Sequence, residues 1–128
     1  MKTKLSLTIL GVYNTIVGLA MLFCASWGAT QILSNTENAE LVRMAELLHY
    51  GLSPAVLIIG LMLLLNRKTS LETAKNLFLA YIIGTAVLMY VFFTIMANEP
   101  LMNFGVDKAA PDVVMFLLAI YAYLKPKK

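Results

Sequence analysis

The chain has 128 residues, of which 60% are hydrophobic and 13% are charged, and its mean hydropathy is +0.79. This length allows one small domain and excludes a separate soluble domain beside a membrane part. The formal net charge of +3 comes from lysines that flank apolar stretches, so it does not indicate a nucleic-acid partner. A single cysteine excludes an internal disulfide.

Residues 5–27 form the first apolar stretch, and their only ionisable groups are the thiol of Cys24 and the phenol of Tyr13. About 20 apolar residues cross the hydrocarbon core of a bilayer as a helix. We therefore predict a first membrane span here, with Trp27 as an interfacial anchor. The basic start of the chain resembles a signal peptide, but the apolar stretch is longer than a signal core. The two residues before Cys24 are large, unlike a lipoprotein cleavage site, so we expect the span to be retained.

A polar segment separates the first two apolar stretches. Ser34 lies three residues before Glu37, which is a capping-box pattern and predicts a helix start. Apolar residues then recur at helical spacing over 39–49, which indicates an amphipathic helix. This helix either lies on the outer surface or continues directly into a second span over 47–65, with a bend near Pro54.

The third apolar stretch follows a short basic turn at 66–70. Residues 77–97 have no ionisable side chain other than tyrosine, and we predict a third span over 74–97. Ser70 or Thr69 can cap the start of this helix.

The last apolar stretch is short. We expect an irregular outer loop over 101–110, after which Pro111 and Asp112 open a fourth span over 111–124. Its apolar part has about 12 residues, or about 18 Å of helix, whereas the hydrocarbon core is about 30 Å thick. We therefore expect Asp112 to lie below the outer surface, covered by the segment 101–108.

The charges are sorted by sign along the chain. Basic residues mark the cytoplasmic side of a membrane protein. Eight of the ten basic residues lie on one side of the predicted spans, and six of the seven acidic residues lie on the other. The eight basic residues are Lys2, Lys4, Arg67, Lys68, Lys75, Lys125, Lys127 and Lys128.

Together the elements predict one domain over 1–128. It is an all-α, integral membrane four-helix bundle of up-down topology, with an amphipathic outer segment between spans 1 and 2 and both termini cytoplasmic.

Asn14 is the main polar side chain within the first span. Gly11, Thr15 and Gly18 lie near it on the helix surface, and small residues of this kind let helices approach. One interpretation is that Asn14 only joins packed helices, and the other is that it lies at the floor of a ligand cavity. In both cases we expect it to bond a neighbouring helix, because an unpaired amide in hydrocarbon is costly.

A second set of polar residues lies at the predicted outer ends of the spans. Glu46 and His49 are three residues apart, so they share a helix face, and Tyr50 and Asp112 should lie at the same depth. Glu-x-x-His is the spacing of di-iron bundles, but those sites need two such motifs, and this chain has one histidine. A zinc on His49, Glu46 and Asp112 would satisfy the ligand preference of that metal. Alternatively, these are ordinary interfacial polar residues.

We assign no catalytic residue, no metal ligand and no cofactor. The first span contains no carboxylate, unlike that of the four-helix small multidrug exporters, which disfavours a proton-coupled exporter. No Gly-rich phosphate loop or nucleophile triad is present. The candidate ligand-binding residues are Asn14, Glu46, His49, Tyr50 and Asp112.

Three segments carry a resemblance to a known family: Gly-Val-Tyr-Asn-Thr-Ile-Val-Gly-Leu-Ala-Met-Leu at 11–22, the helix crossing 47–67, and Pro-Asp-Val-Val-Met-Phe-Leu-Leu-Ala at 111–119. In hydropathy and glycine pattern the chain resembles the small four-helix bacterial membrane proteins of the DoxX-like type. The resemblance implies a location in the bacterial inner membrane and, for some members, an accessory role in redox membrane complexes. It assigns no catalytic residue.

The leading hypothesis is a small, non-enzymatic membrane protein. It is either an accessory subunit, with a membrane-protein partner or a second copy of itself, or a binder of a hydrophobic small molecule. Eight methionines and many aromatic residues suit an adaptable apolar cavity. One alternative is a membrane enzyme or metal protein that uses the outer residues around His49. Another is a small transporter or channel that works as an oligomer.

Overall fold

The computed structural model describes residues 2–127, which are almost entirely helical. Over these residues the only β-type pairing is an isolated bridge between Leu33 and Met102. Three of the described helices, α1, α3 and α4, are long and apolar enough to cross a membrane. The elements in chain order are α1 (Thr3–Phe23), α2 (Ala25–Ile32), α3 (Ala39–Leu65), α4 (Leu71–Thr94), the 3-10 helix η1 (Met96–Asn98) and α5 (Val106–Leu124).

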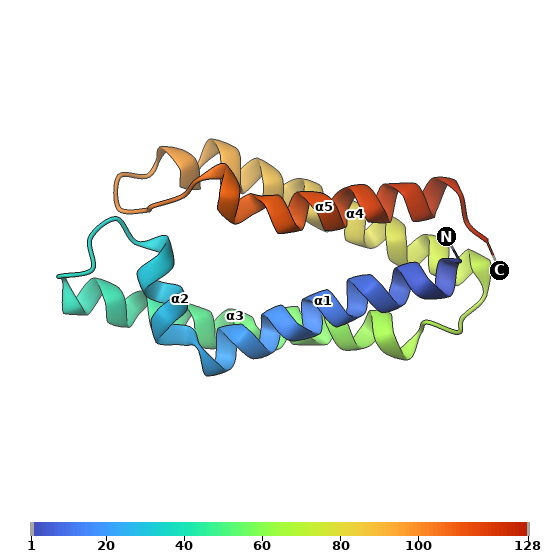
Figure 1. The fold of residues 1–128 in the computed structure, drawn as a ribbon, viewed down its shortest axis with the longest axis horizontal. Coiled ribbons are helices and arrows are strands. Elements are labelled where there is room, and N and C mark those ends of the chain that lie inside the picture. Colours follow the sequence, from blue (N-terminus) through green and yellow to red (C-terminus); the bar gives the residue numbers. More distant parts are fainter. Residues whose placement is uncertain (1, 128) are drawn as a thin grey trace.

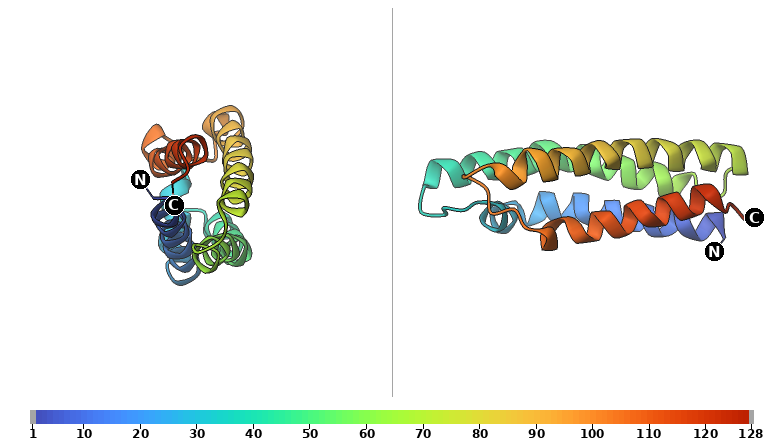
Figure 2. Two further views of the ribbon diagram at one scale, coloured as in Figure 1. Left: turned by 90° about the vertical axis from the view of Figure 1, so that its right-hand side faces the viewer. Right: turned by 90° about the horizontal axis from the view of Figure 1, so that it is seen from above.

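The long helices form two pairs (Figure 1). α1 packs mainly against α3, and α4 packs mainly against α5. Seen end-on, the four helices follow one another around the molecule in the order α1, α3, α4, α5 (Figure 2). Both termini lie at the same end, where Thr3 N donates to Lys127 O at 2.8 Å and Lys127 N donates to Thr3 Oγ1 at 2.9 Å.

The contact between α1 and α3, called here the seam, is made by small residues. A Cβ added to Gly18 would lie 2.8 Å from the backbone nitrogen of Leu57, and one added to Gly60 would collide with Thr15. Ser53 Oγ also donates to Gly18 O at 2.8 Å. The two backbones can approach this closely only because these positions carry almost no side chain.

Buried side chains gather at both ends of the molecule. The larger cluster lies toward the termini and joins all four long helices around Phe78, which is completely buried. A smaller cluster of Ala29, Leu33 and Ala45 joins α2 to α3. The larger cluster consists of Leu7, Leu10, Leu63, Ala74, Phe78, Ala119 and Ala122.

The region between the first two predicted spans differs from the prediction. The first helix ends at Phe23, and Trp27 belongs to the separate short helix α2. The predicted start at Ser34 is wrong, because Asn38 caps α3 by accepting from Glu40 N and Leu41 N at 3.1 Å. Ser34 Oγ instead donates to a carbonyl of the connection that precedes α5.

Helix α3 is continuous from Ala39 to Leu65 and includes Pro54. Of the two arrangements expected for the amphipathic segment, the structure therefore has the one in which it runs directly into the second apolar stretch. A proline within an apolar helix is tolerated where neighbouring groups satisfy the freed backbone.

The last helix also differs from the prediction. The expected loop over 101–110 is partly helical, and α5 begins at Val106 with Pro111 in its second turn. Gly105 precedes the helix and Asp107 lies in its first turn, where a carboxylate is favourable. With 19 residues, α5 is about 28 Å long at about 1.5 Å per residue, so the expected shortfall in length largely disappears.

The connection before α5 pairs with the segment after α2. Asn103 N donates to Ile32 O at 2.8 Å, and Ser34 N donates to Leu101 O at 3.1 Å. These bonds tie the two helix pairs together at the end opposite the termini (Figure 1).

Candidate functional site

A cleft of about 730 Å³ separates the two helix pairs in the middle of the molecule. Its volume lies in the range of small-molecule sites, which is roughly 300–1,000 Å³. Over the described residues α3 and α4 scarcely touch, so the cleft opens sideways between them. Its walls are mostly apolar and include Val17, Met21, Val56, Ile59, Leu88 and Phe92.

Small residues keep this cleft open. Ala55 on α3 and Ala80 and Gly84 on α4 all line it. A Cβ added to Gly84 would meet no atom within 4 Å. The same residue type that closes the seam therefore leaves empty space here.

Asn14 lies at the floor of the cleft. Its side chain is 9% exposed, and its Nδ2 donates to Leu10 O at 2.8 Å and to Tyr81 Oη at 3.2 Å. Tyr81 belongs to α4, so this bond joins the two helix pairs. The expectation that Asn14 bonds a neighbouring helix is confirmed.

Asp112, the second residue of the predicted fourth span, lies on the same cleft. Its Oδ1 accepts a hydrogen bond from Tyr13 Oη at 2.7 Å, which links α1 to α5. Among residues 2–127, no Lys, Arg or His nitrogen lies within 4.0 Å of this carboxylate. From the described residues the carboxylate therefore has one hydrogen-bond partner and no counter-charge.

The cleft thus has free acceptors at its floor. Within the described part of the chain, Asn14 Oδ1 and Asp112 Oδ2 accept no hydrogen bond. A carbonyl or carboxylate oxygen in apolar surroundings is stabilised when a donor reaches it. The geometry suits an apolar molecule that carries a hydrogen-bond donor at one end.

The other predicted site residues lie elsewhere. His49 Nδ1 is 2.8 Å from Ala45 O, and the far side of its ring covers Gly28 of α2. Glu46 Oε2 accepts from Arg43 at 2.7 Å. Tyr50 is 40% exposed. None of these three predicted residues lines the cleft, so the structure brings Asn14 and Asp112 to one cavity and leaves the others at the junction of α2 and α3.

Glu46, His49 and Asp112 have separate partners and form no hydrogen-bonded cluster over residues 2–127. In the same part of the chain, no group of three His, Cys, Asp or Glu side chains could hold a metal ion. The zinc alternative that we considered from the sequence therefore has no geometric support.

Comparison of the chain with protein-family models, curated proteins and solved structures finds no match. The DoxX-like resemblance stays a prediction. The function proposed below rests on this chain's own residues.

Two tyrosines of the site escaped the sequence analysis. Tyr13 and Tyr81 supply the hydroxyls that meet Asp112 and Asn14. Both lie well inside apolar stretches, and a tyrosine hydroxyl in such surroundings usually finds a hydrogen-bond partner. Their position in apolar stretches therefore indicated that each hydroxyl would have a partner, but it did not indicate which polar groups the hydroxyls would contact.

Proposed function

We propose that this protein is a small, non-enzymatic integral membrane protein that binds an elongated hydrophobic molecule between its two helix pairs. The observation that carries the proposal is the apolar cleft of about 730 Å³, which opens sideways and is lined by few polar side chains, among them Asn14 and Asp112. An alkyl or isoprenoid chain would lie between α3 and α4. A head group that donates a hydrogen bond would meet Asn14 and Asp112.

The membrane setting is supported by the outer surface. Large apolar side chains point outward along the long helices, including Ile16, Ile58 and Ile83, each more than half exposed. Such a surface is stable in lipid and would aggregate in water. We therefore propose that α5 crosses the bilayer together with the three longer apolar helices, as a four-helix bundle of up-down topology.

The orientation follows from charge. The end that carries both termini also carries Lys4, Arg67, Lys68 and Lys127, so we propose that it is cytoplasmic. A bacterial inner membrane and a DoxX-like kinship remain parts of the proposal that rest on the sequence pattern. Reporter fusions at Lys68 and Lys128 should both read cytoplasmic and one at Asn38 external. An external C-terminus would overturn this orientation.

The cleft favours ligand binding over a purely structural role as an accessory subunit. A subunit that only fills space between partners needs a packed interior, whereas this interior is open next to unpaired hydrogen-bond acceptors. An enzyme would need an activated nucleophile or an acid–base pair. The residues that line the cleft include no serine, cysteine, lysine or histidine.

Native mass spectrometry of the protein purified from membranes in mild detergent tests the proposal. Wild type should retain a bound molecule. Gly84→Leu places a side chain in the open space of the cleft and should release that molecule. Gly51→Leu is the matched control, because Gly51 is equally open but does not line the cleft.

Retention of the molecule by the Gly51→Leu protein and its loss from the Gly84→Leu protein would support the proposal. If both variants retained it, or if wild type carried nothing, the cleft would not be a binding site. Unchanged circular dichroism in both variants would show that the helices remain intact.

A further inference from the structure

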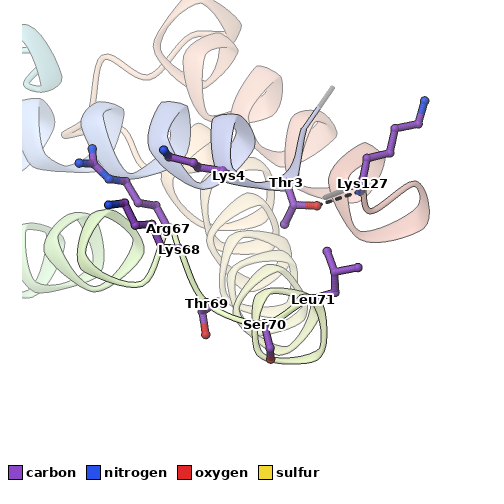
Figure 3. A pocket seen from close by; sticks show the side chains of 8 residues that line it. All are labelled: Thr3, Lys4, Arg67, Lys68, Thr69, Ser70, Leu71 and Lys127. Carbon is purple, nitrogen blue, oxygen red and sulfur yellow. Dashed lines mark hydrogen bonds between the residues drawn. The ribbon is translucent and has the colours of Figure 1, made fainter.

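A second pocket, of about 360 Å³, lies at the end that carries both termini (Figure 3). Its walls come from the start of α1, the turn between α3 and α4, and the segment after α5. They are rich in basic side chains and are independent of the cleft. The residues that matter here are Lys4, Arg67, Lys68 and Lys127, together with Ser70 and Leu71.

The charged ends of three of these residues gather on one side of the pocket. Figure 3 shows the side chains of Lys4, Arg67 and Lys68 directed to the same region, whereas Lys127 extends away on the far side. Over residues 2–127, none of the four has a carboxylate within 4.0 Å. The pocket is therefore a concentration of positive charge without a counter-ion from the described chain.

Two nearby lysines at the same end differ from these. Lys75 Nζ lies 5.6 Å from the centre of the Tyr123 ring, and Lys125 Nζ lies 5.8 Å from the centre of the Tyr121 ring. Both are within the distance of a cation–π contact. They carry the same charge as the pocket lysines but have partners of their own and do not line the pocket.

The walls of the pocket are held in place by backbone and cap bonds. Thr3 and Lys127 exchange two hydrogen bonds, which fix the end of the chain against the start of α1. Ser70 Oγ accepts from Thr73 N at 3.2 Å and caps α4, and Thr69 N donates to Asn66 O at 3.0 Å within the turn. α1 and α4 both begin here, so the partial positive charges of their N-terminal ends add to those of the side chains.

We propose that this pocket binds the phosphate of an anionic phospholipid head group. Lys and Arg together recognise phosphate by charge and by hydrogen bonds. The pocket lies at the proposed membrane surface, and Leu71 adds an apolar side chain that would meet the first carbons of a lipid's acyl chains. Free phosphate shares the same chemistry but would gain nothing from that side chain.

The competing explanation is that these residues only orient the protein by their charge, as basic residues at the cytoplasmic side do in general. In that case every basic residue at this end should contribute alike. The two sets of basic residues distinguish these explanations. They carry equal charge at the same end of the molecule, but one set lines the pocket and the other contacts tyrosine rings outside it.

The test is calorimetric titration of the full chain in a non-ionic detergent. The probes are dihexanoyl phosphatidylglycerol, dihexanoyl phosphatidylcholine and inorganic phosphate. Lys4→Gln with Arg67→Gln removes two charges from the pocket, and Lys75→Gln with Lys125→Gln removes two charges outside it. All four side chains are exposed, so both proteins should fold as wild type does.

We expect saturable binding of phosphatidylglycerol, which the pocket pair weakens about tenfold or more and the control pair less than about twofold. Equal losses from the two pairs would show general surface charge and overturn the proposal. Inorganic phosphate that binds as tightly as phosphatidylglycerol would overturn the lipid assignment. Equal binding of phosphatidylcholine, or no saturable binding at all, would contradict the proposal as well.

Discussion

Glycine has opposite uses in the seam and in the cleft. In the seam, a Cβ on Gly11 would lie 2.7 Å from Leu64 Cγ, and one on Gly18 would lie 2.8 Å from Leu57 N. In the cleft, a Cβ on Gly84 would meet nothing within 4 Å. The same residue type lets two backbones touch in one place and leaves room for another molecule in the other.

The comparison shows that a small residue in an apolar helix does not by itself predict helix packing. Between helices in lipid there is no hydrophobic driving force, so association depends on close van der Waals contact and hydrogen bonds. α1 and α3 have both over a long stretch. α3 and α4 have neither in the middle of the molecule, so another molecule can fill the space between them.

The largest expected effect comes from adding one methyl group to each region. Gly60→Ala should destabilise the protein by about 1–3 kcal/mol, because the new Cβ collides with Thr15 and the backbones must separate. Gly84→Ala, the matched control, should leave the stability unchanged or raise it by up to about 1 kcal/mol, because the position is open and alanine is favoured over glycine within a helix. The measurement is the free energy of unfolding in detergent micelles. Similar losses for the two variants would contradict the distinction between seam and cleft.

The next effect concerns the hydrogen bond that crosses the cleft floor. A double-mutant cycle with Asn14→Leu and Tyr81→Phe should give a coupling energy of about 0.6 kcal/mol, and at most about 1.7 kcal/mol, as for other bonds between membrane helices. Asn14→Leu should also weaken retention of the bound molecule in the mass-spectrometric experiment. A coupling energy of zero would mean that the two helix pairs are not joined there.

An effect of similar size is expected from the hydrogen bond inside the seam. Ser53→Ala removes the bond to Gly18 O and should cost about 0.5–1 kcal/mol of stability. Because Ser53 does not line the cleft, retention of the bound molecule should stay at the wild-type level. Loss of the molecule from this variant would show that the two regions are coupled more closely than their geometry indicates.

The smallest effect is expected outside both regions. Arg43→Ala removes an exposed ion pair with Glu46 at the junction of α2 and α3. Stability should change by less than about 0.5 kcal/mol, because the guanidinium is well solvated. Thermal unfolding followed by circular dichroism would check this, and a shift as large as that of Gly60→Ala would contradict it.

The sequence predicted the long helices because their apolar lengths are a large signal. It also predicted that Asn14 would bond a neighbouring helix, since a buried amide has few alternatives. It placed the start of α3 at Ser34, because Ser34 and Asn38 are both good caps and only the tertiary bond from Ser34 to Pro100 decides between them.

The candidate site was predicted in part. Asn14 and Asp112 do line one cavity, but the sequence grouped Asp112 with Glu46 and His49 by estimated depth alone. Depth along a helix can be counted from residue numbers, whereas rotation about its axis depends on the packing partner. The cleft itself could not be predicted from the sequence, because nothing in the sequence distinguishes Gly84, which lines the cleft, from Gly60, which packs against another helix.

The most direct test of the central claim is photolabelling of the protein with 3-azioctanol, a neutral apolar alcohol whose hydroxyl can donate a hydrogen bond. Tyr13 and Tyr81 line the cleft, whereas Tyr50 and Tyr90 are 40% and 65% exposed outside it. If the cleft is a binding site, labelling that excess octanol suppresses should concentrate on Tyr13, Tyr81 and Asp112. If the labelling that octanol suppresses instead falls mainly on the exposed residues Tyr90 and Tyr50, the account is contradicted.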